Sequence, residues 1–261
     1  MPVFLYAGDN LELSDFFNRE TKAAIAFSGG VDSAYLLYAA KKYGAEVCAY
    51  YVKTQFQPEF EYIDAVKLAE TVGADMKTIR LDILKNRIIA QNPENRCYLC
   101  KKTILSTITE QAAADGFKLI AEGTNASDDA GDRPGMAAVK ELSVVSPLRE
   151  CGLTKADVRR LSKEAGLFTW NKPSYSCLAT RIMNGEQITG DKLRRIEAAE
   201  CVLSEMGFSD LRVRLHGENA VLQFTDGDIE KAFSKRRDIF ALLSEYFGSV
   251  AIDLKERERS E

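Results

Sequence analysis

The sequence predicts an α/β protein, with a doubly wound parallel sheet in a large first domain and a smaller α+β domain after it. Two observations predict this fold. Through the first two thirds of the chain, short apolar segments alternate with helical segments, which is the pattern of a parallel sheet covered by helices. After Pro173 this alternation stops and a long charged helical segment begins. We therefore expect one domain over residues 1–168 and another over 169–261.

In the first domain, strands are expected where short apolar segments are bounded by turn residues. These segments lie at 23–27, 47–52, 76–81 and 118–121. Helices are expected at 31–43, 58–72 and 98–115, and each is followed by a glycine that suits a helix C-terminus. Thr154 and Asp157 have the spacing of a capping box, which predicts a further helix that stops at Gly166.

The second domain is expected to combine two helices with an antiparallel hairpin and a last strand. The hairpin strands are 211–215 and 220–224, which a polar turn at 217–219 joins. Helices are expected at 189–206 and 228–246, and the last strand at 250–254.

Composition and charge indicate an ordinary soluble protein. With 35 Lys and Arg against 39 Asp and Glu, the formal net charge is −4 and the pI is near 5.4. Most nucleic-acid-binding domains are basic, so this balance argues against such a partner. No apolar stretch is long enough to span a membrane, and the N-terminus lacks the basic start and apolar core of a signal peptide. We therefore expect a cytoplasmic protein.

The first predicted strand is followed by a glycine-rich turn that leads into a helix. It reads Ser28-Gly29-Gly30-Val31-Asp32-Ser33. Two glycines let the backbone approach an anion, and a helix N-terminus supplies N–H groups and a favourable dipole, so the turn is expected to bind phosphate. Ser28 and Ser33 can donate hydroxyl hydrogen bonds. Asp32 would repel phosphate, and is expected to stabilise the loop, cap the helix or bind Mg²⁺; a plain tight turn is the alternative for the whole segment.

A second polar loop follows the fourth predicted strand, at the same edge of the sheet. It contains Glu122-Gly123-Thr124-Asn125 and continues through Asp128 and Asp129 to Arg133. Gly123 permits close packing, Thr124 and Asn125 can bond a nucleotide, and a carboxylate such as Asp128 could hold Mg²⁺. Arg133 could neutralise phosphate. Taken alone, this segment would also suit an acidic surface loop.

Three of the six cysteines stand where a reactive or metal-binding thiol is expected. Cys97 and Cys100 form a C-x-x-C pair at a helix start beside cationic residues, which favours the thiolate form. Cys177 lies in a Pro- and Ser-containing loop at the expected domain junction. A redox pair, a zinc site, a bare catalytic thiol and an iron–sulfur cluster are all open. Zinc needs four ligands, whereas three thiolates can hold a 4Fe–4S cluster and leave one iron open, so the cluster is favoured.

The remaining thiols and the single histidine are not expected at the site. Cys48 falls in a predicted strand and is expected in the core, and Cys151 and Cys201 are expected to behave as ordinary small apolar residues. His216 falls in the predicted hairpin of the second domain.

The string SGGVDS resembles the PP-loop of the N-type ATP pyrophosphatases, which activate a substrate oxygen as its adenylate and release pyrophosphate. This resemblance implies a Rossmann-like sheet of the adenine nucleotide alpha hydrolase-like (HUP) type, and ATP and Mg²⁺ as reactants. With EGTNASDD and above all PSYSCLATRI, residues 173–182, the resemblance narrows to the LarE family. Its members are ATP-dependent sulfur transferases of nickel-pincer nucleotide biosynthesis, and the similarity covers essentially the whole chain.

The family resemblance implies a small-molecule substrate, pyridinium-3,5-dicarboxylic acid mononucleotide, whose carboxylates become thiocarboxylates for the cofactor of lactate racemase. In some members one cysteine gives up its own sulfur, and in others a C-x-x-C pair joins that cysteine to hold a 4Fe–4S cluster that delivers sulfide. Cys177 matches the shared cysteine, and Cys97 and Cys100 match the extra pair. The chain is therefore expected to be of the cluster-bearing type, with sacrificial donation from Cys177 as the alternative. The family also forms homohexamers of two trimers.

Three arginines are implied by the same resemblance as ligands of the substrate's phosphate: Arg181, Arg212 and Arg214. Arg212 and Arg214 share one face of a predicted strand, and guanidinium groups suit phosphate bidentately. Without the resemblance, an exposed charged strand face would be the better interpretation. Glu200 either acts near the site or lies on a solvated helix face.

Three other functions stay open. A tRNA-thiolation enzyme also combines a PP-loop with cysteines, but would be expected to carry a basic RNA-binding region. A nucleotide-binding or iron–sulfur module without turnover would bind ATP and release no pyrophosphate. An amide-forming ATP pyrophosphatase would need an ammonia source, and the sequence has no recognisable glutaminase domain.

Overall fold

The computed structural model describes residues 12–128 and 135–257, so Asp129 and Arg133 of the predicted site lie outside the described residues. The chain forms two compact units. The first comprises Met1–Lys53, Glu59–Leu81 and Cys97–Lys172. The second comprises Thr54–Pro58, Asp82–Arg96 and Pro173–Glu261, so two short segments from the first half of the chain join it. The predicted division of roles between residues 1–168 and 169–261 stays a prediction.

The first unit is built on a parallel sheet of four strands, which confirms the predicted fold class. The strands are β1 (Lys22–Ala26), β2 (Glu46–Lys53), β3 (Asp75–Arg80) and β4 (Leu119–Glu122). Their order is β3-β2-β1-β4, and each neighbouring pair is parallel.

The predicted helices at 31–43, 58–72 and 98–115 are confirmed as α2 (Val31–Lys42), α3 (Glu59–Val72) and α5 (Arg96–Ala114), which connect the strands. The predicted helix after Thr154 is α8 (Lys155–Glu164). The first unit also contains α1 (Leu13–Arg19), α6 (Gly135–Glu141), α7 (Pro147–Glu150) and a 3₁₀ turn η2 at Phe168–Asn171. The capping box at the start of α8 is present, because the Thr154 and Asp157 side chains each bond the other's backbone N–H.

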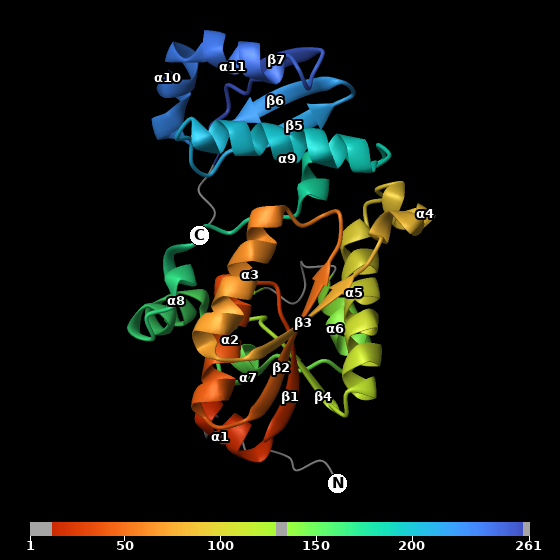
Figure 1. Ribbon diagram of the computed structural model, residues 1–261, viewed down its shortest axis with the longest axis vertical. Helices are drawn as coiled ribbons and strands as arrows, with labels where there is room; N and C mark the ends of the chain where they lie inside the picture. The colour runs from red at the N-terminus through yellow and green to blue at the C-terminus, as the bar shows by residue number, and fades with distance from the viewer. Residues whose placement is uncertain (1–11, 129–134, 258–261) are drawn as a thin grey trace. The chain divides into compact units, whose positions relative to one another are not determined.

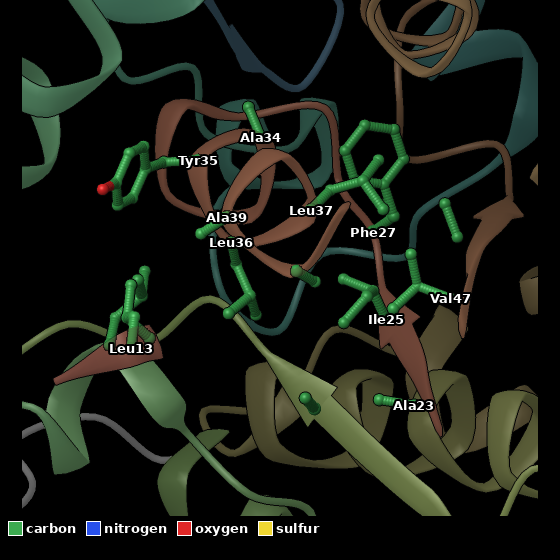
Figure 2. Close-up of a cluster of buried hydrophobic side chains, with 14 of the residues drawn as sticks. Leu13, Ala23, Ile25, Phe27, Ala34, Tyr35, Leu36, Leu37, Ala39 and Val47 are labelled. Atoms are coloured by element: carbon green, nitrogen blue, oxygen red, sulfur yellow. The ribbon is translucent and has the colours of Figure 1, made fainter. Parts of the chain in front are cut away.

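The sheet buries both faces, which explains why its central strands are apolar at almost every position. Successive side chains of a strand point to opposite faces. Ala23 and Ile25 of β1 therefore join one apolar cluster with α1, α2 and α3, and Ala24 joins a second cluster with α5 and α6. Figure 1 shows α2, α3 and α8 on one side of the sheet and α5 and α6 on the other. Figure 2 shows the first cluster, to which α2 contributes Leu36 and Leu37 and β1 contributes Ile25.

The strand order determines where this unit can bind a ligand. Strands β1 and β4 are neighbours, but the helix after β1 and the helix before β4 cover opposite faces. Open α/β sheets bind ligands beyond the carboxyl ends of the strands where the connections diverge in this way. The two polar loops that the sequence singles out follow β1 and β4, and both therefore lie at this edge.

The second unit contains a three-stranded sheet and the helices that cover it. Strands β5 (Arg212–His216) and β6 (Asn219–Gln223) form the predicted antiparallel hairpin, and β7 (Ser249–Ile252) pairs parallel to β6. The unit also holds α4 (Arg87–Ala90), the 3₁₀ turns η1 (Ile83–Lys85) and η3 (Leu178–Arg181), and helix α9 (Gly190–Glu205). In the described part of the chain, no helix has the length and apolar character to cross a membrane.

The single helix predicted at 228–246 is wrong, because two helices occupy this segment. They are α10 (Asp226–Ser234) and α11 (Arg236–Leu243), and Lys235 between them has φ −93° and ψ 10°. The Ser234 hydroxyl donates to the Lys231 carbonyl at 2.7 Å. The Lys235 N–H still donates to the Lys231 carbonyl at 3.0 Å, so the first helix ends where the ψ of Lys235 departs from the helical value.

Candidate active site

The PP-loop of the first unit leaves the start of α2 open to an anion. Gly30 is the N-cap residue of α2 and supplies no side-chain cap, so the first N–H groups of the helix lack this partner. Gly29 has φ +76°, and a Cβ there would lie 2.9 Å from the Cβ of Ala65 on α3. Only glycine fits this position, because both the conformation and the neighbouring helix exclude a side chain.

Two serines close the loop. The Ser33 hydroxyl donates to the Gly30 carbonyl at 3.2 Å and accepts from the Ser28 backbone N–H at 3.2 Å. The two serine hydroxyl oxygens are also 3.1 Å apart. These hydrogen bonds hold the turn in a fixed shape.

The loop after β4 packs directly against the PP-loop. A Cβ on Gly123 would lie 2.7 Å from the backbone nitrogen of Ser33 and 3.0 Å from the carbonyl carbon of Asp32. Thr124 and Asn125, which follow, are buried. The absence of a side chain at Gly123 therefore allows the two loops to come together at the carboxyl edge of the sheet.

Asp32 is the charged centre of this arrangement. Its carboxylate accepts from the Asn125 side-chain amide at 3.1 Å and from the Lys155 ammonium at 2.6 Å. The backbone N–H of Asn125 donates in turn to Asp128 at 3.0 Å. Lys155 was not predicted from the sequence, because it approaches Asp32 from a helix 123 positions away along the chain.

Glu122, at the end of β4, holds the loop that follows this strand. It is buried, and it accepts from the Ser146 hydroxyl at 2.6 Å and from the Thr124 backbone N–H at 3.1 Å. The Lys101 ammonium of α5 lies 3.2 Å from its other oxygen. A buried carboxylate with three such partners is well satisfied and holds the loop rigidly.

The C-x-x-C pair lies on the first turns of α5. Cys97 is exposed and Cys100 is half-buried, and both belong to the first unit, whereas Cys177 belongs to the second. The predicted set of three cysteines as cluster ligands stays a prediction. Within the described residues, no three or more His, Cys, Asp or Glu side chains gather as ligands for a metal ion. The Mg²⁺ roles of Asp32 and Asp128 likewise stay predictions.

The other cysteines differ in burial. Cys48 is in the core, as predicted, and Cys151 is half-buried. Cys201 is exposed on α9, and its expected behaviour as an ordinary small apolar residue stays a prediction. Partial or full loss of water contact at the sulfur raises the pKa of all three thiols, in the case of Cys151 to about 11. These thiols are therefore poor nucleophiles at neutral pH.

In the second unit, the segment that carries Cys177 is tied to two other segments of the chain. The guanidinium of Arg96 donates to the Cys177 sulfur at 3.5 Å. The backbone N–H of Leu178 donates to the Phe56 carbonyl at 2.9 Å, and the Thr180 hydroxyl donates to the Cys177 carbonyl at 2.8 Å. The sulfur is thus held beside a cation on a braced loop.

Arg181 connects this loop to α9. Its side chain is only 1% exposed, and its guanidinium donates to Glu200 at 2.9 Å and 3.2 Å. It also donates to the Ser176 carbonyl at 2.8 Å and hydroxyl at 2.7 Å. Arg181 therefore braces the Cys177 loop; its role as a ligand of the substrate's phosphate stays a prediction.

Glu200 is buried, so the alternative of a solvated helix face is wrong. The residue is 7% exposed and accepts from Arg181, from the Val213 backbone N–H at 2.9 Å and from the Tyr175 hydroxyl. Burial and the nearby Glu200 carboxylate raise the pKa of Tyr175, which keeps this hydroxyl protonated.

The two strand arginines also surround Tyr175 and the loop. Arg212 is 4% exposed, and its guanidinium lies 4.9 Å from the centre of the Tyr175 ring, with Arg181 at 4.6 Å. Arg214 donates to the Thr180 carbonyl at 2.7 Å. Burial and the charge of Arg181 lower the pKa of Arg212 to about 10, which leaves it cationic at neutral pH. The alternative of an exposed charged strand face is therefore wrong for Arg212.

The parallel sheet, its strand order and the glycine-rich loop at its carboxyl edge define a PP-loop protein. Residues 22–94 match the family described as Queuosine biosynthesis protein QueC. An uncharacterized protein of Synechocystis is 35% identical over 84% of this chain and 82% of its own length. The pyridinium-3,5-bisthiocarboxylic acid mononucleotide synthase of Lactiplantibacillus plantarum is 32% identical over 80% of this chain and 76% of its own length. The chain belongs to the family of this synthase, the LarE family.

A more distant relative is the tRNA-specific 2-thiouridylase MnmA of Pseudothermotoga lettingae. It is 28% identical over 64% of this chain and 58% of its own length. The chain is an enzyme of the sulfurtransferase type that these names describe, in a PP-loop family that uses ATP and Mg²⁺.

Proposed function

We propose that the chain adenylates the carboxylates of pyridinium-3,5-dicarboxylic acid mononucleotide and converts them to thiocarboxylates for the nickel-pincer cofactor of lactate racemase. The observation that carries this proposal is Cys177, held 3.5 Å from Arg96 on a loop braced by Arg181. It occurs in a chain that also has an open PP-loop and a relative named for this product.

The first unit would supply the adenylation step. The PP-loop N–H groups and the hydroxyls of Ser28 and Ser33 suit the polyphosphate of ATP, and Asp32 and Asp128 suit its Mg²⁺. A carboxylate oxygen of the substrate attacks the α-phosphorus of ATP, and the bond to the β-phosphate breaks. Pyrophosphate leaves, and the substrate carries an acyl adenylate.

The second unit would bind the substrate's phosphate and supply sulfur. Arg212 and Arg214 present guanidinium groups from one strand, and Arg181 keeps the neighbouring loop in place. Sulfur attacks the activated carbonyl carbon, and AMP leaves with the original carboxylate oxygen. Each carboxylate would consume one ATP.

Two sources of sulfur fit this chain. In the first, Cys97, Cys100 and Cys177 would hold a 4Fe–4S cluster, which would supply sulfide. Cys97 is exposed, and Cys100 and Cys177 are half-buried, so all three lie outside the apolar core and suit an incoming cluster. In the second, the Cys177 thiolate forms a thioester; loss of its α-proton then breaks the Cβ–S bond, which releases the thiocarboxylate and leaves dehydroalanine.

Iron and sulfide analysis of anaerobically prepared protein separates the two sources. About four irons per chain, lost when Cys97 and Cys100 are both changed to Ala, would support the cluster. An iron-free protein whose mass falls by one H₂S at Cys177 after a single turnover would establish sacrificial donation.

Thiolation of tRNA is the second candidate, which the similarity to MnmA favours. A pyrophosphate-release assay with the pyridinium dicarboxylate mononucleotide, tRNA and ammonia as separate acceptors distinguishes the functions. We expect release, and a thiocarboxylate product, with the mononucleotide alone. Release that depends on tRNA and is lost after RNase treatment would overturn the proposal.

A further inference from the structure

The PP-loop contains a carboxylate at a place where an anion is expected. Asp32 is the second residue of α2, and the loop around it is shaped to receive phosphate. Two negative charges that lie close together repel each other, and in a partly buried site solvent and salt screen this repulsion only weakly. The structure must therefore contain a group that offsets the charge of Asp32.

Lys155 is that group. Its ammonium lies 2.6 Å from one oxygen of Asp32, and the two side chains are 25% and 22% exposed. Asn125 donates to the other oxygen at 3.1 Å. An ammonium is a compact charge on a flexible stem with three donors, so it can keep one partner and turn to another.

The backbone of Lys155 is held in a defined position, whereas its long side chain can rotate. It is the first residue of α8, directly after the Thr154 capping box. Its backbone N–H donates to the Ser127 hydroxyl at 3.0 Å, in the loop that follows β4. The charge is therefore delivered to the PP-loop from a third element of the first unit, at a defined position.

We propose that Lys155 is a nucleotide-binding residue that contacts the pyrophosphate portion of ATP. Lys155 pairs with Asp32 in the structure. When Mg·ATP binds, its ammonium turns to the polyphosphate, and the Asp32 carboxylate can then contact Mg²⁺. This inference rests on the proposed ATP chemistry and adds a specificity to it: the site distinguishes ATP from AMP by the charge of Lys155.

Calorimetric binding of Mg·ATP, pyrophosphate and AMP, without any sulfur acceptor, tests this role. We expect Lys155→Met to weaken ATP and pyrophosphate binding roughly 10- to 100-fold, the range for a lost charge-assisted hydrogen bond, and AMP binding less than about threefold. Lys155→Arg, which keeps the charge, should retain most of the affinity. Lys163→Met is the matched control, because Lys163 is exposed on the same helix, and it should change none of the three affinities.

Asp32→Asn gives an independent readout. Without Mg²⁺, removal of this carboxylate should strengthen pyrophosphate binding by about threefold or more, and the double variant with Lys155→Met should lose the gain. Equal weakening of ATP and AMP by Lys155→Met, or no weakening of either, would overturn the inference. If the unaltered protein bound ATP normally in that experiment, the proposed function would be unaffected. Absence of ATP binding by the unaltered protein would contradict both.

Discussion

The PP-loop of the first unit and the Cys177 loop of the second unit are held in place by different kinds of contact. In the first unit, the phosphate loop is made of backbone N–H groups, serines and glycines whose missing side chains let segments approach, as at Gly29 and Gly123. In the second unit, the Cys177 loop is held by buried ionic side chains, above all Arg181 and Glu200. The first arrangement depends on shape, and the second depends on a balance of charges removed from water.

This difference predicts which substitutions each unit tolerates. The PP-loop is expected to lose its shape when a single methyl group is added where two segments approach closely. The Cys177 loop is expected to lose its position when a charge of the buried ion pair is removed without any change of size. The following variants test this contrast.

The largest effect is expected from Cys177→Ala, which should stop sulfur transfer and leave pyrophosphate release intact. Removal of the sulfur should lower thiocarboxylate formation at least about 1000-fold, because no other group replaces a nucleophile or cluster ligand. Single-turnover release of pyrophosphate should persist, since the groups proposed to bind ATP belong to the first unit. Cys201→Ala is the control, and persistence of the thiolated product within tenfold in Cys177→Ala would contradict the assignment.

Gly123→Ala should have the next largest effect, and on the first unit alone. The added Cβ would lie 2.7 Å from the Ser33 nitrogen, so the PP-loop must shift. We expect pyrophosphate release to fall about 100-fold, as for other small displacements of catalytic groups. Gly227→Ala adds a methyl group with no atom within 4 Å and should leave the rate unchanged. An active Gly123→Ala protein would show that close approach of the two loops is unnecessary.

Glu200→Gln keeps the size of the side chain and removes its charge. It should slow sulfur transfer about tenfold and lower the free energy of unfolding by about 3 kcal/mol, because the buried Arg181 loses its counter-ion. Binding of ATP should not change. Glu205→Gln, on an exposed position of the same helix, is the control. Loss of ATP binding in Glu200→Gln would contradict the claim that Glu200 acts on the Cys177 loop alone.

The smallest effect is expected at Lys172, whose ammonium lies 3.0 Å from Glu61 and 2.7 Å from Asp64 in the first unit. Burial raises the pKa of Glu61, and Lys172 opposes the rise. Lys172→Met should therefore raise it further and destabilise the protein by about 1–3 kcal/mol at neutral pH.

The pH dependence of this loss has a defined sign. When the folded pKa of a carboxyl is raised, the native state binds more protons than the unfolded state, so stability falls as pH rises above the ordinary value of 4.5. Urea unfolding should show the deficit of Lys172→Met shrinking toward pH 5 and growing toward pH 8. Lys22→Met, which breaks an exposed pair with Glu46, should change stability by less than about 0.5 kcal/mol at either pH. A deficit independent of pH would contradict the role assigned to Glu61.

The sequence predicted the parts of the molecule that are local in the chain. The parallel strands followed from apolar segments, and the capping box of α8 from the spacing of Thr154 and Asp157. The PP-loop was recognisable because its glycines, serines and Asp32 are contiguous. The break at Lys235 was missed, because it is a change in the backbone angles of one residue, which helical periodicity does not report.

Contacts between distant segments were harder to predict. Nothing in the spacing of Lys155 indicates that it reaches Asp32, and nothing in the charged helix α9 distinguishes buried Glu200 from exposed Glu205. The family resemblance named Arg181, but the packing shows that its guanidinium is committed to Glu200 and Ser176. Such contacts arise from tertiary structure, which a charge pattern alone does not encode.

The most direct test of activation by adenylation follows the oxygen atoms of the substrate's carboxylates. The substrate is prepared with a heavy oxygen isotope in its carboxylates, and the AMP formed during turnover is analysed by mass spectrometry. Activation as an adenylate predicts one labelled oxygen in AMP for each thiocarboxylate formed, because AMP leaves with the carboxylate oxygen. Unlabelled AMP beside a thiolated product would contradict the central claim that the protein activates its substrate by adenylation.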